Sequence, residues 1–172
     1  FHIYQIGLSE EIMKPTWMIE GGAKVVEEIY TQQHYGQSEF DRGLFPVSAT
    51  VLSNPEAFEK FERDGGLVGS PADINYNSSA FMVLALVDML EARAIPEARA
   101  FEMVLKDFVA ELPDHVDWRD AFQSVFAMSV EDFYSALGNS PYPSTGATDS
   151  WYQGPAIDIG VVLPSKSLTL NE

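Results

Sequence analysis

The feature that most constrains the fold is an apolar run from Ala80 to Leu90, interrupted only by Asp88. A run of this length, opened by Ser78 or Ser79 and reaching to about residue 93, predicts a helix that is buried on nearly all sides. It is too short to cross a bilayer, which requires about 20 apolar residues. We therefore expect it to be the most buried element of the protein.

Apolar residues recur at helical spacing on both sides of this run, between residues that start or stop helices. Pro15 is suited to the first turn of a helix and Gly36 to its end. Asp117 and the capping signal at 129–132 open two further helices, the last of which ends at Gly138. The expected fold class is mainly α, bundle-like, with helices over 1–6 (a last turn), 15–36, 54–66, 78–93, 96–113, 117–126 and 129–138.

The chain length and composition predict one folded domain followed by a tail. With 172 residues, 46% hydrophobic and 21% charged, the chain can bury a substantial core. After Gly138 the composition shifts to Ser, Pro, Thr and Gly. We expect a helical domain over 1–138 and an extended tail over 139–172, in which 157–163 either forms a strand or packs along the body.

The charge and the lack of cysteine restrict the possible partners and cofactors. A formal net charge of −16 argues against binding to nucleic acid or to anionic membranes, since phosphates would be repelled. No segment predicts insertion into a membrane. Because the chain has no cysteine, any metal would need His, Asp or Glu ligands.

A demanding pattern lies at the start of the second predicted helix, Pro15-Thr16-Trp17-Met18-Ile19-Glu20-Gly21-Gly22-Ala23. The indole of Trp17 is suited to anchoring the helix in a core, and the small residues after Glu20 allow close approach of another helix or a ligand. A carboxylate in so crowded a place needs a partner, because an unpaired buried charge is costly. A metal ion is one such partner.

This segment resembles the P-x-W-[LM]-x-E-G-x-A signature of gluzincins, the zinc peptidases that include thermolysin-like enzymes and related aminopeptidases. The resemblance implies that Glu20 is the third zinc ligand and that a His stands on the preceding helix. His2 lies eighteen residues before Glu20, and Phe1-His2-Ile3-Tyr4-Gln5 reads like the end of an H-E-x-x-H-x-x-Q helix. The first His and the glutamate base would then precede Phe1, in a longer parent protein.

The same resemblance implies roles for two further residues. Tyr76, just before the apolar run, corresponds to a tyrosine that stabilises the oxyanion, although Ser78 and Ser79 stand where the family has Lys and Gly. Glu27 corresponds to a carboxylate that orients a ligand His. Residues 122–133 resemble the helix pair that closes many gluzincin domains, where it is structural.

The sequence thus favours the C-terminal half of a gluzincin catalytic domain, part of a zinc-dependent peptidase acting on a peptide or protein substrate. This chain alone is expected to be inactive and to bind zinc weakly or not at all, because the motif's first His and base are missing. The resemblance to this family favours a periplasmic or extracellular location. The alternative is a non-enzymatic helical module, derived from a metallopeptidase, that binds a partner protein.

Overall fold

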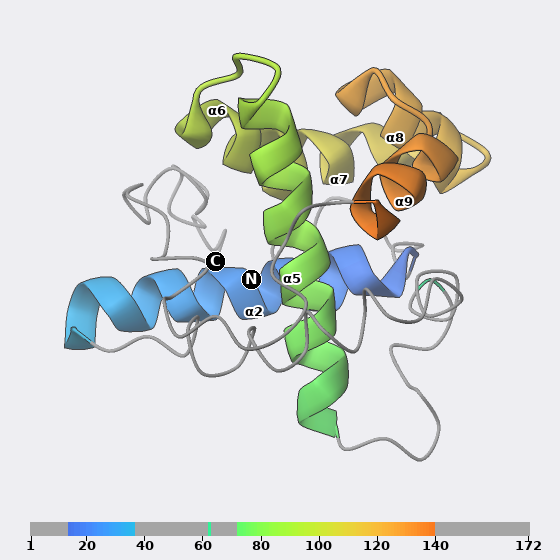
Figure 1. Cartoon of the computed structure of the whole chain (residues 1–172). Helices are drawn as coiled ribbons and strands as arrows, with labels where there is room; N and C mark the ends of the chain where they lie inside the picture. Colours follow the sequence, from blue (N-terminus) through green and yellow to red (C-terminus); the bar gives the residue numbers. More distant parts are fainter. Residues whose placement is uncertain (1–13, 37–61, 63–71, 140–172) are drawn as a thin grey trace, which may run out of the picture.

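The computed structural model describes residues 14–36, 62 and 72–139, and every regular element in this part of the chain is helical, as predicted (Figure 1). The elements are α2 (Thr16–Tyr35), α5 (Ala72–Glu91), α6 (Glu97–Glu102), η1 (Met103–Asp107), α7 (Phe108–Glu111), η2 (Leu112–Asp114), α8 (Trp118–Phe126) and α9 (Val130–Gly138). Of these, η1 is a π-helical turn and η2 a 3₁₀ turn, and α6, η1 and α7 follow one another without a break.

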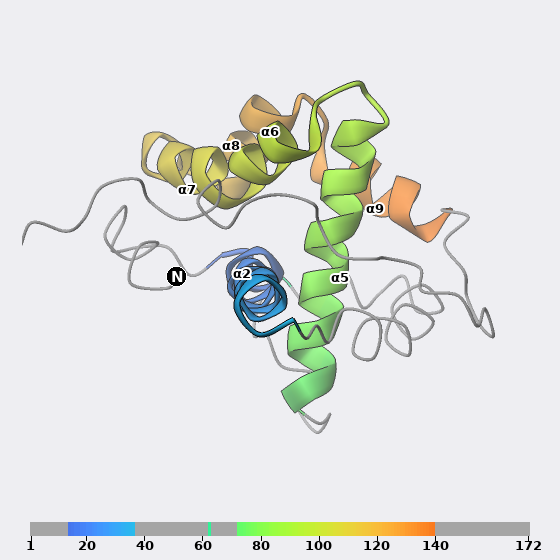
Figure 2. The same cartoon turned by 90° about the vertical axis from the view of Figure 1, so that its left-hand side faces the viewer.

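The two long helices, α2 and α5, cross each other and form the centre of the fold (Figures 1 and 2). The rod formed by α6, η1 and α7 lies against one half of α5, and α8 and α9 complete that end of the molecule. None of the described helices combines the length and the apolar content needed to cross a membrane.

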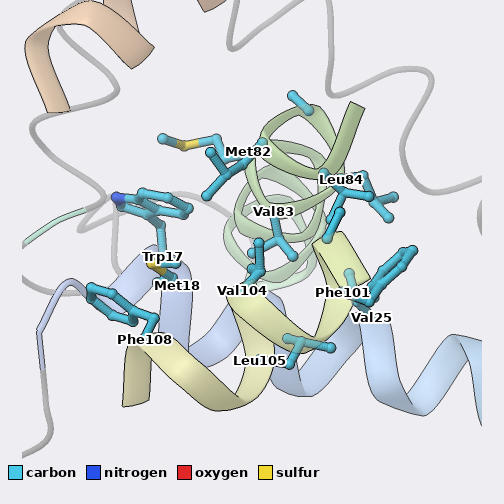
Figure 3. Packing of buried hydrophobic residues seen from close by; sticks show 14 of the residues in the cluster. Trp17, Met18, Val25, Met82, Val83, Leu84, Phe101, Val104, Leu105 and Phe108 are labelled. Atoms are coloured by element: carbon cyan, nitrogen blue, oxygen red, sulfur yellow. The ribbon is translucent and has the colours of Figure 1, made fainter. Parts of the chain in front are cut away.

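The core lies where α2, α5 and the α6–α7 rod meet (Figure 3). Each of these elements contributes a stripe of apolar side chains, because residues three and four apart share one helix face. In α5 every residue from Ala80 to Val87 is buried, which confirms that this helix is the most buried element. The labelled core residues are Trp17, Met18, Val25, Met82, Val83, Leu84, Phe101, Val104, Leu105 and Phe108.

The predicted start of α5 was wrong. The helix begins at Ala72, so Ser78 and Ser79 are interior residues and not its N-cap. Serine is common at N-caps because its hydroxyl accepts a backbone N–H, but a helix interior also tolerates it where a small side chain is required. Both serines are buried, and neither hydroxyl has a hydrogen-bond partner in the part of the chain that the structure describes.

The caps predicted at Asp117 and Ser129 and the helix end predicted at Gly36 are confirmed. The carboxylate of Asp117 accepts the backbone N–H of Arg119 at the start of α8, and Ser129 accepts that of Asp132 at the start of α9. Gly36 ends α2 in the left-handed conformation, with φ at 65°, which glycine adopts without steric cost.

Three predictions fall on other parts of the chain. The helix end at 1–6, the helix at 54–66 and the tail, with its segment 157–163, lie outside the described residues, apart from Glu62 and Asn139. The division into a domain over 1–138 and a tail over 139–172 stays a prediction.

Candidate functional site

The first turns of α2 carry the candidate metal ligand. Glu20 lies in the second turn of α2 and is half-buried. The indole of Trp17, one turn earlier, is fully buried; its ring stacks on Phe133 at 5.5 Å and meets Phe122 edge-on at 6.5 Å. Aromatic packing of this kind stabilises beyond the area it buries. Trp17 therefore anchors the start of α2 against α8 and α9, as its position in the signature predicted.

Directly after Glu20, Gly21 packs closely on the backbone of α5. A Cβ atom at Gly21 would lie 2.9 Å from the backbone nitrogen of Ala80 and closer still to the carbonyl group of Ser79. Only a residue without a side chain fits here, because the obstacles are backbone atoms. The small residues after Glu20 thus serve the close approach of another helix, one of the two uses expected for them.

The candidate oxyanion donor, Tyr76, lies three residues before Ser79 on α5. The sequence placed Tyr76 ahead of the apolar helix, which is wrong: it lies inside α5, because the helix begins at Ala72. Its side chain is 46% exposed and so accessible from solvent. Along their helices, Glu20 directly precedes Gly21, and Tyr76 precedes Ser79, whose backbone meets Gly21, by three residues.

The carboxylate that α2 buries is not Glu27 but its neighbour, Glu28. Glu27 is exposed and accepts a hydrogen bond from Lys24 at 3.2 Å, whereas Glu28 is 4% exposed and its Oε1 lies 2.7 Å from Lys24 Nζ. Burial acts to lower the pKa of Lys24, but its hydrogen bond and ion pair with Glu28 raise the pKa overall. Gly21, Val25 and Glu28 follow one another at intervals of four and three, a spacing that marks one helix stripe; this was the signal in the sequence that could have identified Glu28.

A second buried carboxylate, that of Glu62, was not among the residues predicted from the sequence. Its Oε1 accepts a hydrogen bond from the hydroxyl of Tyr134 at 2.8 Å, and its Oε2 accepts one from Arg119 at 2.6 Å. The Tyr134 hydroxyl in turn accepts the indole N–H of Trp17 at 3.1 Å. Burial, reinforced by the charge of Glu62, raises the pKa of Tyr134, so the phenol keeps its proton. No sequence spacing signals these contacts, because the partners come from distant segments.

The described residues show no metal site of the kind that the resemblance implies. No group of three His, Asp or Glu side chains within 14–36, 62 and 72–139 is arranged to hold a metal ion. His2 lies outside the described residues. Comparisons with protein-family models, curated proteins and solved structures found no match. Glu20 fits the role of one zinc ligand by its chemistry and its half-buried position, since zinc accepts carboxylate oxygen beside imidazole nitrogen.

Proposed function

We propose that this chain is part of a gluzincin-type zinc peptidase, to which it contributes two metal ligands and a hydrogen-bond donor for the oxyanion. The ligands are His2 and Glu20, and the donor is Tyr76. The observation that supports the proposal is the crossing at Gly21, because Glu20 directly precedes Gly21 and Tyr76 precedes Ser79, on whose backbone Gly21 packs, by three residues.

In this proposal Glu20, Tyr76 and Glu27 would each have a chemical task in peptide hydrolysis. When bound, zinc would supply a Lewis acid that lowers the pKa of a water molecule and polarises the peptide carbonyl. The carboxylate of Glu20 would hold the metal from a helix that Trp17 anchors in the core. The phenolic O–H of Tyr76 would donate a hydrogen bond to the negative charge that develops on the carbonyl oxygen. Glu27 remains the residue assigned by the resemblance to orient a ligand His.

The test is the zinc content of the longer parent polypeptide, purified as wild type and as Glu20→Ala. We expect about one zinc per wild-type chain and strong loss of zinc in Glu20→Ala, because a three-ligand site loses one of its ligands. Glu91→Ala, which removes an exposed carboxylate from the far end of α5, is the matched control and should retain its zinc.

Unchanged zinc stoichiometry in Glu20→Ala would remove Glu20 from the site and favour the alternative, a helical module that binds a partner protein. The codons preceding Phe1 provide an independent check. An H-E-x pattern directly before Phe1 would complete the motif, and a different sequence there would contradict the peptidase proposal.

A further inference from the structure

Among the first N–H groups of α2, those of Met18 and Ile19 donate to the backbone carbonyl of Pro15, whereas that of Thr16 finds its acceptor outside the helix. The first four N–H groups of any helix have no acceptor within it, and a capping side chain commonly supplies one. The residue in this place, Pro15, has no side-chain acceptor and makes no such bond. A helix end without a cap frays readily, and Glu20 lies only one turn further along.

The missing cap is provided by Glu62, which lies 46 residues away from Thr16. The backbone carbonyl of Glu62 accepts the N–H of Thr16 at 3.2 Å and its hydroxyl at 3.3 Å. Glu62 therefore satisfies the first amide of α2 and takes the place of a local cap.

The side chain of Glu62 is itself held on both oxygens. Tyr134 of α9 donates to one oxygen and Arg119 of α8 to the other, and the residue is buried, with 7% of its surface exposed. Trp17 donates to the same Tyr134 hydroxyl, so the first turn of α2 reaches α9 by a second route. A buried carboxylate whose charge is fully paired has one preferred position, because any displacement leaves a charge without a partner.

We propose that Glu62 is a positioning residue that holds the first turn of α2 against α8 and α9 and thereby fixes the location of Glu20. We call Glu62 with its partners Thr16, Trp17, Arg119 and Tyr134 the Glu62 clamp. A metal ligand has to be held to within about 0.5 Å by the structure around it, and the clamp supplies that constraint. The expected effect of Glu62 on zinc binding by Glu20 rests on the proposed function, whereas the hydrogen bonds of the Glu62 clamp do not depend on it.

The test uses Glu62→Gln and Tyr134→Phe in the parent polypeptide. Glu62→Gln removes the negative charge and one of the two acceptor oxygens, and Tyr134→Phe removes the hydroxyl. Both substitutions leave the shape of the side chain nearly unchanged. Amide hydrogen exchange at residues 16–19 should become at least about tenfold faster in both variants, while exchange at 80–90 of α5 stays at the wild-type rate. The indole N–H resonance of Trp17 should also shift in Tyr134→Phe, because its acceptor is gone.

Glu111→Gln is the matched control. Glu111 also accepts two side-chain hydrogen bonds, from His115 and Ser124, but these lie on the α7–α8 side and do not involve α2. Glu111→Gln should leave amide hydrogen exchange at residues 16–19 unchanged. Equal acceleration over 16–19 and 80–90 in the clamp variants would indicate general destabilisation and overturn the inference, as would unchanged exchange at 16–19.

Zinc affinity separates the inference from the proposed function. Loss of a residue that orients a ligand lowers metal affinity by about 10- to 100-fold, and we expect a loss in this range for Glu62→Gln. Wild-type zinc binding with undiminished affinity in Glu62→Gln would overturn the positioning role and leave the peptidase proposal intact. A wild-type protein that binds no zinc would overturn the peptidase proposal, and the exchange rates would still decide whether the clamp exists.

Discussion

Replacing Gly21 with alanine tests the helix crossing on which the candidate site depends. The added Cβ would lie 2.9 Å from Ala80 N and still closer to the Ser79 carbonyl group, well inside the sum of the van der Waals radii, whereas ordinary contacts of a Cβ begin near 3.4 Å. All of these obstacles are backbone atoms in the buried part of α5, so no side chain can rotate out of the way. The two helices would have to separate.

Two opposing effects set the size of the change. Alanine stabilises a helix interior by about 1 kcal/mol relative to glycine. Overpacking costs typically 1–3 kcal/mol and occasionally more, and a clash with backbone belongs at the upper end of that range. We expect Gly21→Ala to lower the free energy of unfolding by roughly 2 kcal/mol and the melting temperature by roughly 4–8 °C.

The assay is thermal and urea unfolding followed by circular dichroism at 222 nm, with two comparison variants. Gly36→Ala meets no atom within 4 Å but has φ at +65°, so it should cost only about 1–2 kcal/mol through backbone strain. Ser79→Ala keeps the backbone that Gly21 contacts and should not destabilise. If Gly21→Ala raised the stability by about 1 kcal/mol, helix propensity alone would be at work and the reasoning on the crossing would be refuted.

Three further variants test individual interactions. Ser79→Ala should raise the free energy of unfolding by about 1 kcal/mol, because it removes a buried hydroxyl without a hydrogen-bond partner; urea unfolding that shows a loss would contradict this. Ser129→Ala removes the N-cap of α9 and should lower the free energy of unfolding by about 1 kcal/mol. Ser135→Ala, at an exposed position of the same helix, should leave the free energy of unfolding almost unchanged. The hydrogen bond from His115 lowers the pKa of Glu111, so this carboxylate stabilises the fold above its unfolded pKa of about 4.3 and loses that effect as the pH falls. The stability difference between wild type and Glu111→Gln should therefore shrink in urea titrations from pH 6 to pH 3, and a constant difference would be the contrary result.

The positions of most described helices follow from the sequence alone. The apolar stripes between Pro15 and Gly36 and around Phe108 predicted two helical segments, and the caps at Asp117 and Ser129 marked the starts of two more. These predictions succeeded because they depend on residues three or four apart and on hydrogen bonds within one turn. The place of Glu20 in the second turn of α2 was predictable for the same reason.

Tertiary structure decided how those helices meet. Ser79 resembled a cap in the sequence, but in the fold it is the interior residue on which Gly21 packs. The partners of Glu62 stand 46 to 72 residues away, and no periodicity in the sequence relates positions so far apart. Local spacing thus determined which residues lie on each helix, whereas the packing of α2 on α5, α8 and α9 decided which of them came together, because only packing brings distant segments within hydrogen-bonding range.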